Sequence, residues 1–244
     1  KTGTESGNKY FHLVLLAKNE TGYKNLMKLS SLSYTEGFYY KPRIDQELLE
    51  RYHEGLICTS ACIAGEIPTL IIQGNDEEAA RKAGFFQDLF GKGNFYLELQ
   101  DHGIPDQRIA NRGILSIAKR LDIPIIATND IHYVDREDAV AQDILLCIGT
   151  GKKKSELKRL HFEEQEFYMK SPEEMARIFA EVPEALMHTV EVAEKCQLTI
   201  PLPGPQLPDY QIPQEFSSPE VYLRHLAYEG LQRRYPEVTD ELKN

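Results

Sequence analysis

The sequence has 244 residues, of which 41% are hydrophobic and 27% are charged, and its formal net charge is −10. This composition is ordinary for a soluble chain with a sizeable core, and the acidity argues against a protein whose main surface follows nucleic-acid phosphates. No apolar run approaches the roughly 18 residues that span a bilayer, and the first residues lack the apolar segment of a signal peptide, so we expect a cytoplasmic protein without a membrane partner.

The cysteines and the basic residues are both sparse enough to limit their roles. Cys58, Cys62, Cys147 and Cys196 lack the density of a disulfide scaffold, so we expect reduced thiols, one of which could ligate a metal. The local basic run at residues 151–159 could meet a nucleic-acid backbone. A solvated loop is the more common explanation of a short lysine run.

The first part of the chain alternates between predicted strands and predicted helices. After a loop up to Lys9, the predicted strands are residues 10–17, 55–60, 95–100 and 125–127. The predicted helices are residues 23–35, 45–52, 75–90 and 109–121. Residues 75–78 have the pattern of a capping box, and Gly113 is expected to weaken its helix locally. Strands that alternate with crossover helices predict a parallel sheet, either open or closed into a barrel.

The later part of the chain is predicted to be helical up to a proline-rich stretch. Its predicted elements are a helix at 136–148, a strand at 166–170, a helix opened by a capping box at 171–174, and a helix from Pro183. Prolines then recur as in an extended linker, and Ser218 caps a last helix that reaches Arg234. We therefore divide the chain into residues 1–200, a linker at 201–217, and residues 218–244.

Polar side chains follow the short apolar strand at residues 125–127. Side chains two residues apart point the same way along a strand, so Asp130 and His132 can converge on one point. The carboxyl ends of parallel strands are where α/β proteins place their sites. The alternative is that Asp130 caps the next helix and His132 is a packed loop histidine. Cys62 also follows a predicted strand, where a plain packing thiol is the common case, and His12 is expected to be buried within its strand.

Several stretches resemble one family over nearly the whole chain and in the same order. They are residues 10–18 with 21–26, 37–45, 55–62, 127–133 and 167–171. They resemble the PHP (polymerase and histidinol phosphatase) domain of the DnaE-type alpha subunit of bacterial DNA polymerase III. The resemblance implies part of a distorted (β/α)₇ barrel with a multinuclear metal site at the carboxyl ends of its strands. The linker and last helix resemble the passage toward the polymerase palm.

The resemblance also implies a set of metal ligands. His12, Cys62, Asp130 and His132 fall on metal-ligand positions of the family, and their imidazole, thiolate and carboxylate groups suit zinc, manganese or a similar ion. The His-x-His motif with which the family domain opens is absent, so we expect an amino-terminally truncated part of the domain. The palm carboxylates, which use magnesium, are also absent, so the chain alone is expected to be inactive.

Three functions remain open at this point. The first is an enzyme part: a metal-dependent phosphoesterase of 3′–5′ exonuclease type within a DNA-directed DNA polymerase, whose partners are DNA, deoxynucleotides and other subunits of the polymerase III holoenzyme. The second is a non-catalytic scaffold that stabilises the polymerase and docks the separate proofreading exonuclease subunit. The third is an unrelated barrel metallohydrolase, which the linker and trailing helix do not suit.

Overall fold

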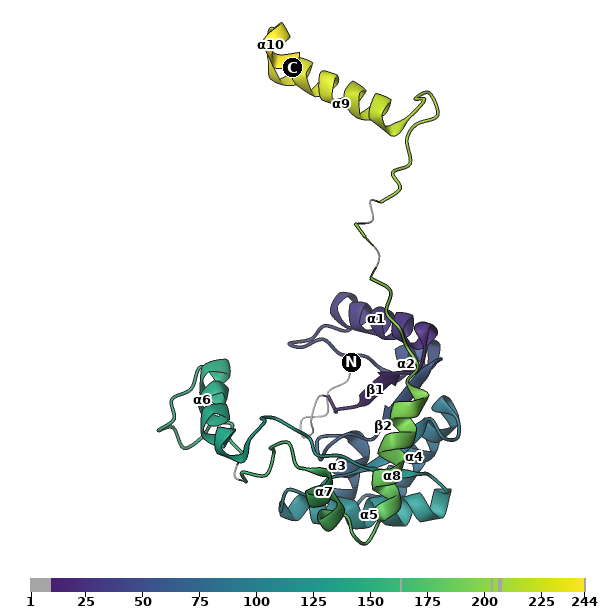
Figure 1. The fold of residues 1–244 in the computed structure, drawn as a ribbon, viewed down its shortest axis with the longest axis vertical. Helices are drawn as coiled ribbons and strands as arrows, with labels where there is room; N and C mark the ends of the chain where they lie inside the picture. The colour runs from purple at the N-terminus through teal and green to yellow at the C-terminus, as the bar shows by residue number, and fades with distance from the viewer. Residues whose placement is uncertain (1–9, 163, 203, 206–207, 244) are drawn as a thin grey trace. The chain divides into compact units, whose positions relative to one another are not determined.

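The computed structural model describes residues 10–162, 164–202, 204–205 and 208–243, so the loop expected before Tyr10 lies outside the described residues. The chain divides into one unit that ends at Ile200 and a second that begins at Pro201 (Figure 1). No helix within the described ranges is long and apolar enough to cross a membrane.

The first unit is built on a sheet of four strands in the order β1-β2-β3-β4. The strands are β1 Val14–Ala17, β2 Leu56–Thr59, β3 Phe95–Leu99 and β4 Ile125–Ala127. The pairs β2–β3 and β3–β4 are parallel, as the alternation of strands and helices predicts, but β1 pairs antiparallel with β2. The expectation of a wholly parallel sheet is therefore wrong for β1. The fold is a mixed α/β sheet with helices packed against it.

The direction of β1 follows from the helices that come after it. α1 (Glu20–Thr35) and α2 (Gln46–Tyr52) pack against each other, and α1 also packs against β1. The chain thus returns to the end of the sheet that it left, where the Lys18 backbone N–H donates to the Gly55 carbonyl at 2.9 Å. A Cβ on Gly22 would lie 2.0 Å from the Gly55 oxygen, so only glycine permits this close approach.

The remaining helices of the first unit come between the parallel strands and after them in the sequence. They are α3 Glu66–Ile72, α4 Asp76–Phe90, α5 Pro105–Leu121, the 3₁₀ turn η1 Arg136–Asp138, α6 Ala139–Thr150, α7 Pro172–Ile178 and α8 Pro183–Lys195. α8 packs on β4, and α3 packs against both α4 and α5. α3 is absent from the sequence prediction, because a seven-residue apolar run that contains Pro68 gives too little helical periodicity to recognise.

Two expectations about local structure need correction. Asn75 is the N-cap of α4, but its side chain makes no capping bond, so the predicted capping box is not formed there. Residues 166–170 form no strand, only a single bridge between Tyr133 and Tyr168. Gly113 has a packing reason in addition to its expected propensity cost, because a Cβ there would lie 2.4 Å from Cγ2 of Ile71 on α3. The capping box at Ser171 and Glu174 is confirmed.

The core lies around the central strands. Every residue of β2, β3 and β4 is buried, as the continuous apolar run predicts for β4. All four cysteines carry free thiols, as expected. The basic run is a loop whose charges are partly paired: Arg159 donates to Asp143 at 2.9 Å, and Lys152 pairs with Glu156 at 3.2 Å.

In the second unit the described residues form the helices α9 (Pro219–Arg234) and α10 (Asp240–Lys243). α9 begins as predicted, because the Ser218 hydroxyl accepts a hydrogen bond from the Val221 backbone N–H at 3.4 Å. No residue of α9 is buried against the described part of the chain.

Candidate metal site

The loops after β2 and β4 both begin with a strained turn. Ala61 has φ +58° and Asp130 has φ +45°, which is the left-handed region that residues other than glycine rarely adopt. Such conformations cost about 1–3 kcal/mol each and are kept where the surrounding structure enforces them, commonly at functional sites. The two turns set the directions of Cys62 and Asp130 at the carboxyl ends of parallel strands.

His12 and Cys62 are in contact. The Cys62 Sγ lies 3.5 Å from His12 Nδ1, and the His12 backbone N–H donates to the Ala64 carbonyl at 3.0 Å. His12 precedes β1, and because β1 is antiparallel to β2, the start of β1 lies beside the end of β2. His12 is exposed, so the expectation that it is buried within a strand is wrong. Cys62 is half-buried.

Asp130 and His132 form a second pair. Asp130 Oδ1 lies 3.6 Å from His132 Nε2, and their side chains are 30% and 37% exposed, so both remain reachable from solvent. The His132 ring packs against Phe162 and Phe167, with centroids 4.8 and 5.4 Å apart. The alternative role of Asp130 as a helix cap is wrong, because the next helical turn is capped by Asp135.

The two pairs are coupled electrostatically. The pKa of the Cys62 thiol is raised, and burial is the largest cause. A backbone hydrogen bond from Ala64 lowers this pKa, and the charges of Asp130 and Glu98 raise it. Within the described residues, however, no group of three or more histidine, cysteine, aspartate or glutamate side chains is assembled so that it could hold a metal ion.

Each pair taken alone has a separation that suits a shared cation. Zinc bonds of about 2.05 Å to nitrogen and 2.3 Å to sulfur at a tetrahedral angle separate the two ligand atoms by about 3.5 Å. The His12–Cys62 separation is 3.5 Å. The same construction gives about 3.4 Å for a carboxylate oxygen and an imidazole nitrogen, against 3.6 Å for Asp130 and His132. The donor types and distances therefore fit a transition metal pair by pair.

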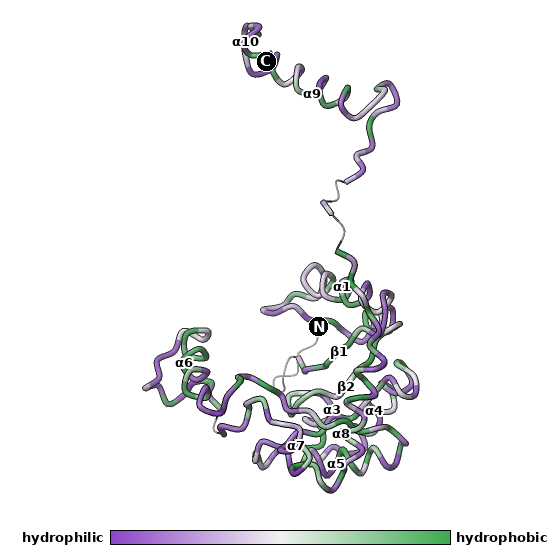
Figure 2. Tube along the Cα trace, viewed as in Figure 1, coloured by the Kyte–Doolittle hydropathy of each residue, from purple (hydrophilic) through white to green (hydrophobic). Residues whose placement is uncertain are grey.

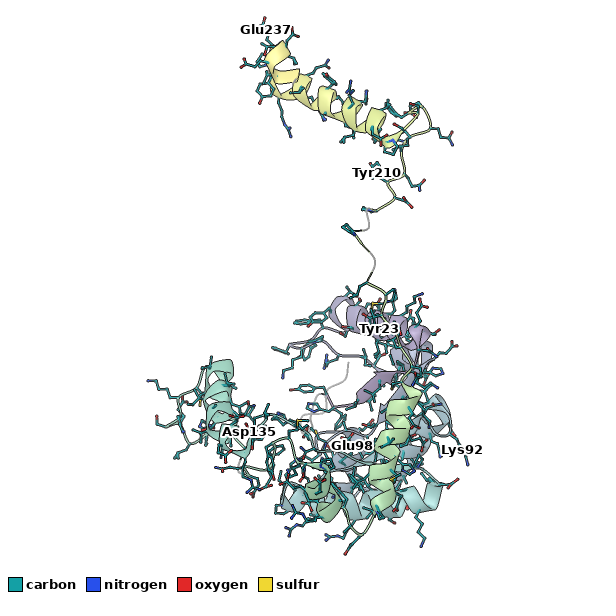
Figure 3. All side chains as sticks on the ribbon, viewed as in Figure 1. Tyr23, Lys92, Glu98, Asp135, Tyr210 and Glu237 are labelled. Carbon is teal, nitrogen blue, oxygen red and sulfur yellow. The ribbon has the colours of Figure 1, made fainter. Side chains whose placement is uncertain are left out.

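Sequence reasoning missed two buried side chains at the same ends of the strands. Glu98 on β3 is 6% exposed and lies inside the first unit (Figure 3). His102, just beyond β3, is 2% exposed, stacks on Phe167 with centroids 4.1 Å apart, and has its Nε2 2.8 Å from the Asn129 carbonyl. A charged residue inside an otherwise apolar strand was the available signal for Glu98. For His102 the sequence offers none.

A small cavity lies beneath the Cys62 loop, with a volume of about 10 Å³. Its lining includes Cys62, Glu98, Gln100 and Asn111. A volume of this size has room for about one water molecule.

Comparison with known proteins identifies the class first. Residues 1–102 match the family described as PHP domain. The rest of the chain extends the match to one kind of protein. The chain is 53% identical over 237 residues, 97% of its length, to DNA polymerase III subunit alpha of Treponema pallidum. It is 55% identical over 245 residues to that of Borreliella burgdorferi and 40% identical over 249 residues to that of Thermus aquaticus.

The chain is homologous to the PHP region of the DNA polymerase III alpha subunit, which confirms the resemblance drawn from the sequence. These matches cover 100% of this chain for the Borreliella relative and 99% for the Thermus relative. They cover only 20%, 21% and 20% of the three relatives, so the chain spans about a fifth of their length.

Proposed function

We propose that this chain is the PHP part of a bacterial DNA polymerase III alpha subunit, and that in the complete protein it hydrolyses phosphoester bonds with a divalent metal. The 3.5 Å contact between His12 and Cys62 carries the proposal, because it joins two metal-binding atoms from residues 50 positions apart. Asp130 and His132 supply the carboxylate and second imidazole. Zinc or manganese suits this donor set.

When bound, the ion supplies an activated water and neutralises charge on the phosphoester. Each residue of the chain then has a task that follows from its surroundings. Cys62 keeps its proton until a cation displaces it, since its pKa is raised, so metal loading releases a proton. His132 must present an unprotonated Nε2 to the ion, and Asp130 Oδ1, 3.6 Å from that nitrogen, would ligate the same ion. The packing of the His132 ring against Phe162 and Phe167 holds its direction.

The proposal extends to the surroundings of the site. The four-stranded sheet belongs to a distorted (β/α)₇ barrel, followed by a linker at 201–217 and by residues 218–244 at the start of the polymerase palm region. The complete protein polymerises deoxynucleotides on DNA with magnesium at the palm and works in the cytoplasm with other polymerase III subunits. The support is the family of the relatives, all named DNA polymerase III subunit alpha.

The test is Asp130→Asn in the complete protein, with Asp122→Asn as matched control because Asp122 is exposed and pairs only with a surface lysine. Metal-dependent release of nucleotides from a 3′ end should be abolished by Asp130→Asn, since a neutral amide cannot balance the cation's charge. Nucleotide incorporation should be unchanged in both variants. Hydrolysis that survives in Asp130→Asn would refute the proposed site.

A scaffold that docks the proofreading exonuclease subunit is the second candidate. α6 supports it, because this helix is largely apolar (Figure 2) and its Ile144, Leu145 and Ile148 are 47%, 59% and 72% exposed. An exposed apolar helix face of this kind is usually covered by another domain or subunit. Unchanged hydrolysis in Asp130→Asn would favour the scaffold, and loss of polymerisation would show that Asp130 is structural.

A further inference from the structure

Glu98 is a buried carboxylate with an unusual set of partners. It lies on β3 between the fully buried Leu97 and Leu99 and is 6% exposed. The Thr59 hydroxyl donates to one carboxyl oxygen and the Thr128 hydroxyl donates to the other. Gln100 adds a third hydrogen bond from Nε2 at 2.9 Å. Both oxygens of Glu98 are therefore occupied as acceptors.

The two threonines belong to the two loops that carry the candidate ligands. Thr59 ends β2, and Cys62 follows three residues later. Thr128 follows β4, and Asp130 comes two residues later. Glu98 also donates from its backbone N–H to the Ser60 hydroxyl at 2.8 Å. The Glu98 side chain on β3 therefore bonds to the start of both loops, directly before each strained turn.

The charge of Glu98 has no cationic partner among the residues described: no lysine, arginine or histidine there forms an ion pair with it. Burying a carboxylate without a counter-charge is costly, and hydrogen bonds from neutral groups offset only part of that cost. Its charge acts on Cys62: it raises the pKa of the thiol, although less than burial and Asp130 do. A cation held by Cys62 and Asp130 would lie within reach of the same charge.

We propose that Glu98 is a positioning residue for metal binding: it holds the Cys62 loop and the Asp130 loop together and supplies buried negative charge that favours a cation between them. The inference rests on the proposed metal-dependent function. It adds a residue that does not itself ligate the ion.

The experiment uses the complete protein loaded with Co²⁺, whose thiolate charge-transfer absorption reports ligation by a cysteine. Cys62→Ser must remove this band, which assigns the signal to this site alone. Glu98→Gln keeps the size of the side chain and removes its charge, and we expect it to weaken Co²⁺ binding about 10- to 100-fold, the loss typical when the support of a ligand is removed. Glu77→Gln is the matched control, because Glu77 is 88% exposed on α4, and it should bind Co²⁺ as the unchanged protein does.

Polymerase activity and thermal unfolding check that each variant is folded. Thr128→Val tests the same link between the loops with less disturbance, because it removes only the hydrogen bond from the Thr128 hydroxyl to Glu98. It should weaken Co²⁺ binding several-fold. If Glu98→Gln binds Co²⁺ as tightly as the unchanged protein, the role of Glu98 is refuted while the metal site stands. If Glu98→Gln does not fold, the same result for Thr128→Val refutes it. If the unchanged protein gives no Cys62-dependent band, both the metal site and the role of Glu98 are refuted.

Discussion

Two helical glycines with opposite surroundings allow a sharp test of the packing beneath the site. A Cβ on Gly113 of α5 would lie 2.4 Å from Cγ2 of Ile71, a branched side chain that cannot swing aside, whereas a Cβ on Gly84 of α4 would meet nothing within 4 Å. Alanine at either position gains the same helix propensity, about 0.8–1.0 kcal/mol. That gain cancels in the difference between the two variants, so the difference measures the overpacking of α3 against α5 alone.

Overpacking of a filled core costs about 1–3 kcal/mol. In a domain of this size each kcal/mol shifts the melting temperature by about 2–4 °C. Gly84→Ala should therefore raise the melting temperature by about 2–4 °C, and Gly113→Ala should melt about 2–12 °C below Gly84→Ala. Thermal unfolding followed by circular dichroism, with urea unfolding to give the free energy, measures both. Equal stabilisation by the two substitutions would refute the close approach of α3 to α5.

Three further outcomes are expected. Burial lowers the pKa of His102, Lys170 lowers it further and Asp130 opposes this, so the unfolded chain binds the proton at a higher pH than the folded chain. The free energy of unfolding should therefore be greatest above about pH 6.5 and should decrease as the pH drops below that value. Urea titrations that show no decrease between about pH 7 and 5.5 would contradict this. Ser171→Ala should cost about 1 kcal/mol of stability, because Ser171 caps α7 and accepts from the Glu174 N–H at 3.2 Å; an unchanged urea midpoint would refute that contribution. The chain without the rest of its protein should bind zinc weakly, and stoichiometric zinc that resists a chelator would contradict this.

The parallel strands were predictable because burial on both faces leaves a mark in the sequence. β4 is a continuous apolar run and β2 and β3 are largely apolar, and the helices between them predict a parallel arrangement. The direction of β1 was not predictable in this way. The return of the chain after β1 brings Gly22 of α1 against Gly55, a contact that a periodicity does not record because the two residues lie far apart in the sequence.

The candidate ligands came from the family resemblance, and their assembly into one site stays a prediction. The role of the residue supporting them could not be found from the sequence. Glu98 stands out as a charged residue in an apolar strand, but its partners Thr59 and Thr128 lie 39 and 30 positions away. Hydrogen bonds between neighbouring strands depend on register, and register is a tertiary property that local pattern does not contain.

The order of the strands along the chain has a consequence for protein synthesis. A ribosome adds about 5–20 residues per second, and His132 follows His12 by 120 positions (132 − 12 = 120). About 6 to 24 seconds therefore separate the two histidines on a nascent chain. During that time the His12–Cys62 pair can already exist, while the Asp130 loop and its tie to Glu98 do not. A metal ion captured early would be held by two side chains only, so secure loading must wait until the segment after β4 has left the ribosome.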